Sequence, residues 1–96
     1  MIKKVFCIYD SISEVYMPPF CEINTQSAIR MIKDAHKNPN SGIGEHADDL
    51  VLYELGAYSD TTAEFNFYSE PKRINKLTHI VNEIVFNEKT HGEDKS

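Results

Sequence analysis

The stretch Leu50-Val51-Leu52-Tyr53-Glu54-Leu55-Gly56 decides the fold of this 96-residue chain. It is rich in residues that favour strands, and apolar side chains occupy both of the alternating faces that an extended segment presents. Such a strand lies inside a sheet, or has one face covered by a partner. The stretch therefore predicts an interior strand whose neighbours come from the rest of the chain.

The sequence before this strand supplies a hairpin and a helix. Val5-Phe6-Cys7-Ile8-Tyr9 is a continuous apolar run typical of a strand covered on both faces, and residues 14–17 then alternate until Pro18-Pro19 ends the pairing. Cap residues at 24–26 precede apolar side chains that recur at helical spacing between Ala28 and His36. A hairpin followed by an amphipathic helix is expected.

The sequence after the interior strand supplies a second hairpin and a second helix. Turn residues at 59–62 lead into Ala63-Glu64-Phe65-Asn66-Phe67, whose alternation predicts a strand with both phenylalanines facing inward. From Pro71 onward, helical spacing of apolar residues predicts the helix, at Ile74, Leu77, Val81 and Ile84.

The element order ββαββα predicts an α+β fold, with a mostly antiparallel four-stranded sheet and two helices on one face. A chain of 96 residues fits one core, and we expect a single domain over residues 1–86. Residues 87–96 contain no apolar side chain and are expected to form a disordered polar tail. The loop at 42–45 lacks periodicity and is expected to be mobile.

Several classes of protein are excluded by composition. No apolar run approaches the roughly 18 to 20 residues that span a bilayer, and the N-terminus does not match a signal peptide. Cys7 and Cys21 lack a CxxC spacing and are expected to be buried, reduced thiols of a cytosolic protein. The four histidines lack zinc-type spacing, so we expect no metal site. The sequence has no nucleotide-binding glycine pattern, nucleophile elbow or HExxH motif, so we expect no cofactor and no enzymatic activity.

Acidic residues concentrate in the middle of the chain, whose net charge is −5. Residues 45–70 carry seven acidic side chains and no lysine or arginine. This segment is either a solvated acidic surface or a face that attracts a basic partner. Within it, His46 with Asp48 or Asp49 is expected to fix the entry into the interior strand; a catalytic dyad is the less favoured alternative.

Basic residues offer one dense cluster for nucleic acid, since binding single strands needs cations for phosphates and aromatic faces for bases. The cluster opens the second predicted helix, where a basic N-terminus leaves room for an anionic ligand. Pairing of these cations with Glu70 or Glu83 is the alternative. The candidate nucleic-acid-binding residues are Lys72, Arg73 and Lys76, helped by Lys3, Lys4 and Arg30.

A homodimer is also expected. Small domains bury little surface, and a strand that is apolar on both faces gains from a symmetry mate. The candidate interface residues are Leu52, Tyr53 and Leu55.

Four segments together resemble one protein family: residues 1–11, the run Tyr16-Met17-Pro18-Pro19-Phe20, the triplet Ala28-Ile29-Arg30, and residues 52–56 with the turn Asp60-Thr61-Thr62. Over roughly residues 1 to 72 the chain resembles the small nonstructural protein of gokushovirus-type microviruses, which are single-stranded DNA phages. Family members commonly have proline where this chain has Ala47, and glycine where it has Ala63.

The resemblance implies a DNA-binding or replication-associated phage protein of the bacterial cytoplasm that is absent from the virion. It implies a role in the switch to single-strand synthesis and packaging, alongside phage replication or packaging proteins, and it carries no catalytic residue. Two functions are therefore weighed. The first is a single-stranded DNA-binding or replication-accessory factor, and the second is a protein-interaction module whose acidic hairpin binds the phage initiator, the procapsid or a host factor.

Overall fold

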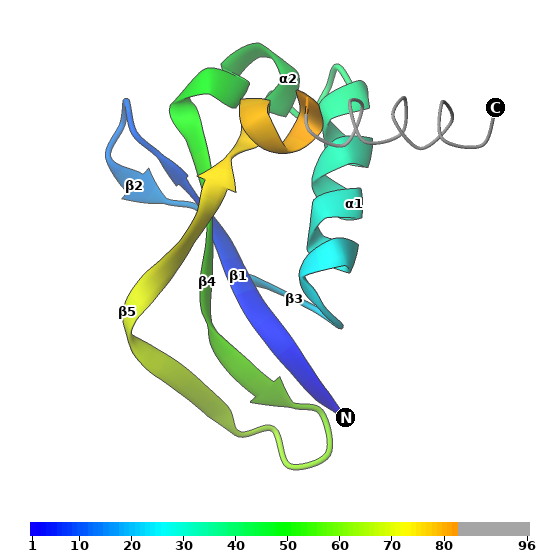
Figure 1. Cartoon of the computed structure of the whole chain (residues 1–96), viewed down its shortest axis with the longest axis vertical. Helices are drawn as coiled ribbons and strands as arrows, with labels where there is room; N and C mark the ends of the chain where they lie inside the picture. The colour runs from blue at the N-terminus through cyan, green and yellow to red at the C-terminus, as the bar shows by residue number, and fades with distance from the viewer. Residues whose placement is uncertain (83–96) are drawn as a thin grey trace, which may run out of the picture.

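Strand β4 (Leu50–Ser59) lies inside the sheet, between β1 (Ile2–Asp10) and β5 (Phe65–Lys76). The structure is a computed structural model that describes residues 1–82, and every strand pair in this range is antiparallel. Figure 1 shows long, bent strands with the helices gathered toward one end. The predicted α+β class and the interior position of the central strand are confirmed.

The outer edge of β1 carries two short strands instead of one. β2 (Val15–Tyr16) pairs with the end of β1, and β3 (Phe20–Glu22) pairs with its first half. Pro18 and Pro19 lie between them, where neither ring nitrogen can donate to the ladder. The sequence correctly placed a break at the prolines, but pairing resumes after them.

Helix α1 (Thr25–Lys37) covers one face of the sheet, as predicted. Asn24 caps it, because its side-chain oxygen accepts a hydrogen bond from the backbone N–H of Ser27 at 2.8 Å. The helix buries its apolar stripe against alternate residues of β1 and β4. The buried core on this face consists of Phe6, Ile8, Ala28, Ile32, Ala47, Leu50, Leu52, Leu77 and Ile80.

The segment before β4 is built differently from the expected loop. It contains the short helix α2 (Ile43–His46) and a 3-10 turn, η1 (Ala47–Asp49). The entry into β4 is held by Asp49, whose carbonyl accepts from the N–H and hydroxyl of Ser11, and by Asp48, whose carboxylate accepts from the Thr78 hydroxyl at 2.7 Å. Ser11 and Thr78 therefore fix the entry into β4 through Asp49 and Asp48, the role that the sequence predicts for His46.

Strand β5 is longer than predicted, and the predicted helix start at Pro71 is wrong. The strand runs to Lys76, and helical backbone covers residues 77–82 of the described range. Lys72, Arg73 and Lys76 pair with β4, so the free hydrogen-bonding edge of β4 overrides the helical spacing of this segment. The three cations are therefore strand residues and do not open a helix.

Side-chain burial corrects three further expectations. Phe65 and Phe67 are 50% and 62% exposed instead of facing inward, because their register with β4 places them on the sheet face opposite to the one that α1 covers. Cys7 is buried as expected, but Cys21 is exposed on the edge strand β3. Leu52 is fully buried beneath α1 and cannot form a dimer surface. The predicted tail at 87–96 and the domain end at 83–86 lie outside the described residues.

Candidate nucleic-acid interface

The six predicted nucleic-acid-binding residues lie in separate places in the fold. Lys3 lies 3.9 Å from the Asp60 carboxylate, and Lys4 lies 3.4 Å from the Glu54 carboxylate, so both contact acidic groups. Arg30 is exposed on α1. Lys72, Arg73 and Lys76 are exposed on β5, and within residues 1–82 no ion pair joins them to a carboxylate. The structure therefore does not bring all six together.

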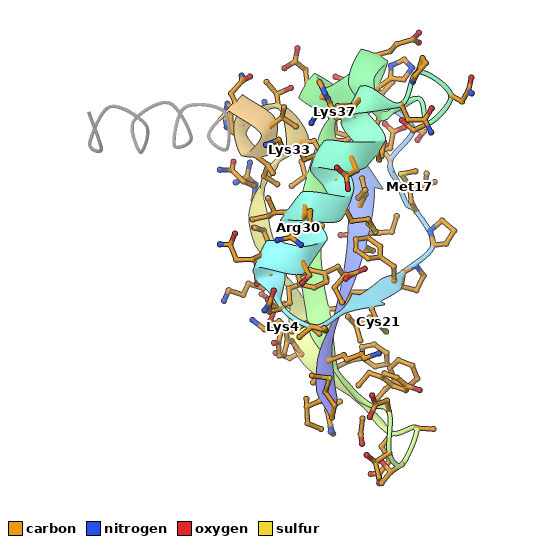
Figure 2. The ribbon with its side chains drawn as sticks, turned by 90° about the vertical axis from the view of Figure 1, so that its right-hand side faces the viewer. Lys4, Met17, Cys21, Arg30, Lys33 and Lys37 are labelled. Carbon is orange, nitrogen blue, oxygen red and sulfur yellow. The ribbon has the colours of Figure 1, made fainter. Side chains whose placement is uncertain are left out.

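The cations of α1 form one row. Arg30, Lys33 and Lys37 are spaced three and four residues apart, which places them on one face of the helix. Figure 2 shows them in sequence along α1, with Lys4 near the N-terminal end of the helix. This row lies on the outer side of the layer that α1 forms on the sheet.

The cations of β5 divide between the two faces of the sheet. Arg73 lies opposite Tyr53 and Lys76 opposite Val51, and cross-strand partners share a face. Tyr53 contacts Tyr9 and Tyr16 and does not belong to the core beneath α1. Arg73 and Lys76 therefore lie on the sheet face away from α1, which we call the open face.

Three aromatic side chains form a ladder on the open face. Tyr58 and Phe65 are cross-strand partners with ring centroids 4.7 Å apart. Phe65 and Phe67 follow at alternate positions of β5, with centroids 5.4 Å apart and rings only 10° from parallel. The two phenylalanine rings are stacked, and at least half of each residue's surface is open to solvent, although the sequence pattern predicts them in the core.

A second aromatic group, the tyrosine cluster, lies at the other end of the open face. It consists of Tyr9, Tyr16 and Tyr53, with centroids between 4.6 and 6.2 Å apart. Desolvation, and then the nearby phenols Tyr53 and Tyr9, raise the pKa of Tyr16 above its usual value of 10.0. Tyr16 is consequently uncharged at neutral pH and does not repel an anion.

An open groove of about 420 Å³ adjoins the tyrosine cluster. Tyr16, Met17, Pro18 and Pro19 line it from the β2–β3 side, Leu55 and Pro71 line it from β4 and β5, and Cys7 lines it from β1. Burial raises the pKa of the Cys7 thiol above 9.0, so this side chain is also neutral at pH 7. None of the described lining residues carries a charge.

Glu54 is the buried charged residue of the described fold, with 2% of its surface exposed. Its carboxylate accepts a short hydrogen bond from the Tyr68 hydroxyl and is approached by Lys4, whose ammonium also lies 3.4 Å from the Thr25 hydroxyl. The hydrogen bond to Glu54 raises the pKa of Tyr68, with desolvation adding to the shift. These contacts tie β5, β4, β1 and the start of α1 together on the covered face.

Other chemistry is sparse in the described range. Among residues 1–82, no group of three or more histidine, cysteine, aspartate or glutamate side chains is arranged to hold a metal ion. A cavity near His46 is lined by Asp10 and Asp49, but the Asp10 carboxylate accepts the backbone N–H groups of Ile12 and Ser13 and closes a turn. No helix in residues 1–82 is long and apolar enough to span a membrane.

The family model described as Phage ORF5 protein matches residues 3–80, which include α1 and all the strands described above except the first residue of β1, Ile2. No curated protein and no solved structure matches the chain.

Proposed function

We propose, from the premise that this chain belongs to the Phage ORF5 protein family, that it is a non-catalytic phage protein that binds single-stranded DNA on its open face. The observation that carries the proposal is the exposed, stacked pair Phe65 and Phe67 on the same sheet face as Arg73 and Lys76. Proteins that bind single strands combine aromatic platforms for bases with cations that follow the backbone.

Charge argues for a single strand over a duplex. The chain has a net charge of −5, and high-affinity duplex binding relies on many phosphate contacts. Stacking on protein side chains requires bases that are free of a partner strand. Exposed aromatic rings supply binding energy through this stacking and need no added positive charge. The resemblance of residues 1–72 to nonstructural proteins of single-stranded DNA microviruses supports the same ligand and a replication-accessory role in the host cytoplasm, outside the virion.

The test is fluorescence anisotropy of a labelled thymidine oligonucleotide at low salt. Arg73→Ala with Lys76→Ala should weaken binding at least about tenfold and make the log–log salt slope less negative by about 1.4, because each lost phosphate contact contributes about 0.7. The wild-type slope should be about −1.4, because Lys72 lies opposite Glu54 on the sheet face that α1 covers and only Arg73 and Lys76 contact phosphate, at about 0.7 per contact.

The matched control is Arg30→Ala with Lys37→Ala, which removes the same charge from α1. It should change the affinity much less, since long-range attraction between exposed charges is screened. Equal losses from both pairs would show that binding is only a response to total charge. No binding at high micromolar protein would reject the proposal.

A protein-interaction module is the second candidate, favoured by Glu64, which is exposed beside Phe65 at the tip of the acidic hairpin. Glu64→Gln separates the two functions, because it should strengthen binding to DNA and weaken binding to a basic protein. Asp60 is unsuitable for this test, since its carboxylate lies 2.7 Å from the N-terminal amine and neutralising it would break that ion pair.

A further inference from the structure

We infer that the groove between Met17 and Pro71 takes one unstacked nucleobase of the bound single strand, so that the open face grips DNA by base insertion as well as by stacking. This inference rests on the proposed function and adds a second, distinct subsite to it. The groove lies next to the Phe65–Phe67 pair along the face, since Leu55 of its lining precedes Gly56, the cross-strand partner of Phe67. Each subsite addresses a different base.

The shape and chemistry of the groove fit a base. Its volume of about 420 Å³ lies in the range of about 300 to 1,000 Å³ typical of small-ligand pockets. Rigid rings line it on both sides, with Tyr16 and Pro19 on one side and Pro71 on the other. Such walls suit a planar, weakly polar ring, and the absence of charge on the described lining residues suits any base equally.

The surroundings of the groove fit the phosphate that a base brings with it. Arg73 follows Pro71 by two residues on β5, is exposed, and lies opposite Tyr53. The Tyr53 ring in turn contacts the Tyr16 ring, 5.7 Å away, and Tyr16 lines the groove. An exposed cation, Arg73, therefore lies beside the apolar groove. This arrangement is complementary to a nucleotide whose base is buried in the groove and whose phosphate remains in solvent.

The backbone of β5 is shaped to leave this space. Four residues, 68–71, lie opposite the single residue Leu55, because the register of the β4–β5 pair shifts between Glu54 and Gly56. A regular ladder would place β5 against β4 at this point. The bulge instead carries Pro71 to the wall of the groove, while Tyr68 from the same bulge is held by Glu54 on the covered face.

The experiment compares a labelled thymidine 12-mer with a 12-mer of the same backbone that lacks bases at every position. The measured quantity is the dissociation constant for the abasic 12-mer divided by that for the thymidine 12-mer. A change in protein charge alters phosphate binding equally for both oligonucleotides, so its effect cancels in this ratio. Met17→Glu and Met17→Lys both obstruct the groove with opposite charges; Met17 is 38% exposed, so both should fold. Val15→Glu, on the same hairpin but outside the groove lining, is the control.

We expect the wild-type ratio to fall at least about fivefold in both Met17 variants, since base stacking on protein side chains is worth about 1 to 3 kcal/mol per base. The control should keep the wild-type ratio. A ratio that is unchanged in the Met17 variants, while the wild type still binds DNA, overturns the groove inference and leaves the proposed function standing. A wild-type protein that binds neither oligonucleotide overturns both.

Discussion

Glu54 shows how one residue links the two faces of the sheet. A carboxylate with 2% of its surface exposed would be costly without partners, and here Tyr68 and Lys4 supply them. Tyr68, which donates the hydrogen bond to Glu54, belongs to the bulge of β5 at residues 68–71. The same bulge contributes Pro71 to the lining of the groove. The hydrogen bond on the covered face therefore stabilises the shape of the open face.

Tyr68→Phe should lower the free energy of unfolding at pH 7 by about 1 kcal/mol. A hydrogen bond to a charged group usually contributes about 1.5 to 3 kcal/mol, and the smaller value is expected because Tyr68 is 44% exposed and solvent screens the bond. It should also change the pH dependence. The folded-state pKa of Tyr68 is raised above 10.0 by the bond to Glu54, so its stabilising effect is complete below the unfolded value and is lost as pH rises through the folded value.

Urea unfolding at pH 7, 9, 10 and 11 measures this effect. The difference between wild type and Tyr68→Phe should shrink as the pH rises above about 10, where unfolded tyrosine ionises. Tyr58→Phe is the control, because it removes a phenol hydroxyl on the open face that does not bond Glu54. A difference between wild type and Tyr68→Phe that stays constant up to pH 11 would contradict the role of the bond.

At the scale of elements, the approach of β5 to β4 depends on Gly56. A Cβ atom at this position would lie 2.1 Å from the carbonyl oxygen of Asn66 and 2.8 Å from the Cα of Phe67. Both contacts are with backbone, which cannot rotate away as a side chain can. The two strands therefore come together here only because residue 56 has no side chain.

Gly56→Ala should lower the free energy of unfolding by about 2 to 3 kcal/mol, the upper part of the range for overpacking in a tight site. Thermal unfolding followed by circular dichroism should show a fall in Tm of about 10 to 20 °C, since a domain of this size loses about 4 to 8 °C per kcal/mol.

Ser69→Ala, exposed on the neighbouring strand β5, is the control and should change Tm by little. A Gly56→Ala protein with wild-type Tm would mean that β5 can move away from β4 without cost.

At the scale of the whole molecule, the fold is long and uneven, with extents of 46 × 34 × 24 Å. α1 covers one sheet face, and the opposite face exposes Phe65 and Phe67. An apolar surface of this kind in a small protein is a site of association. The homodimer expected from the sequence is therefore still a prediction, but with Leu52 replaced by the exposed rings of β5.

Sedimentation velocity at high micromolar concentration should detect a dimer, because burying a large apolar side chain is worth roughly 1.5 to 3 kcal/mol. Phe65→Ser with Phe67→Ser should shift the population to monomer, and saturating thymidine oligonucleotide should do the same if DNA occupies the same face. Ile12→Ser, which removes another exposed apolar side chain at 74% exposure, is the control. A wild-type protein that sediments only as monomer rejects the dimer.

The sequence by itself determined the features that depend on local pattern. The apolar residues of Leu50–Gly56 identified the interior strand, because a run that is apolar on both faces is typical of the covered middle of a sheet and not of its solvated edge. Asn24 and the apolar spacing that begins at Ala28 identified α1, because a cap and a helical stripe act within a few residues. The concentration of negative charge in residues 45–70 likewise follows from the sequence alone, because it is a count of side chains.

Only the tertiary structure decided the features that depend on distant segments. The spacing of Ile74 and Leu77 suits a helix, but the free edge of β4 recruits this segment as a strand and so moves Arg73 and Lys76 to the open face. Phe65 and Phe67 alternate as core residues do, yet their register with β4 places them on the sheet face that α1 does not cover and leaves them exposed. The groove unites residues 7, 16–19, 55 and 71, which no local pattern connects, because its shape comes from a shift in strand register.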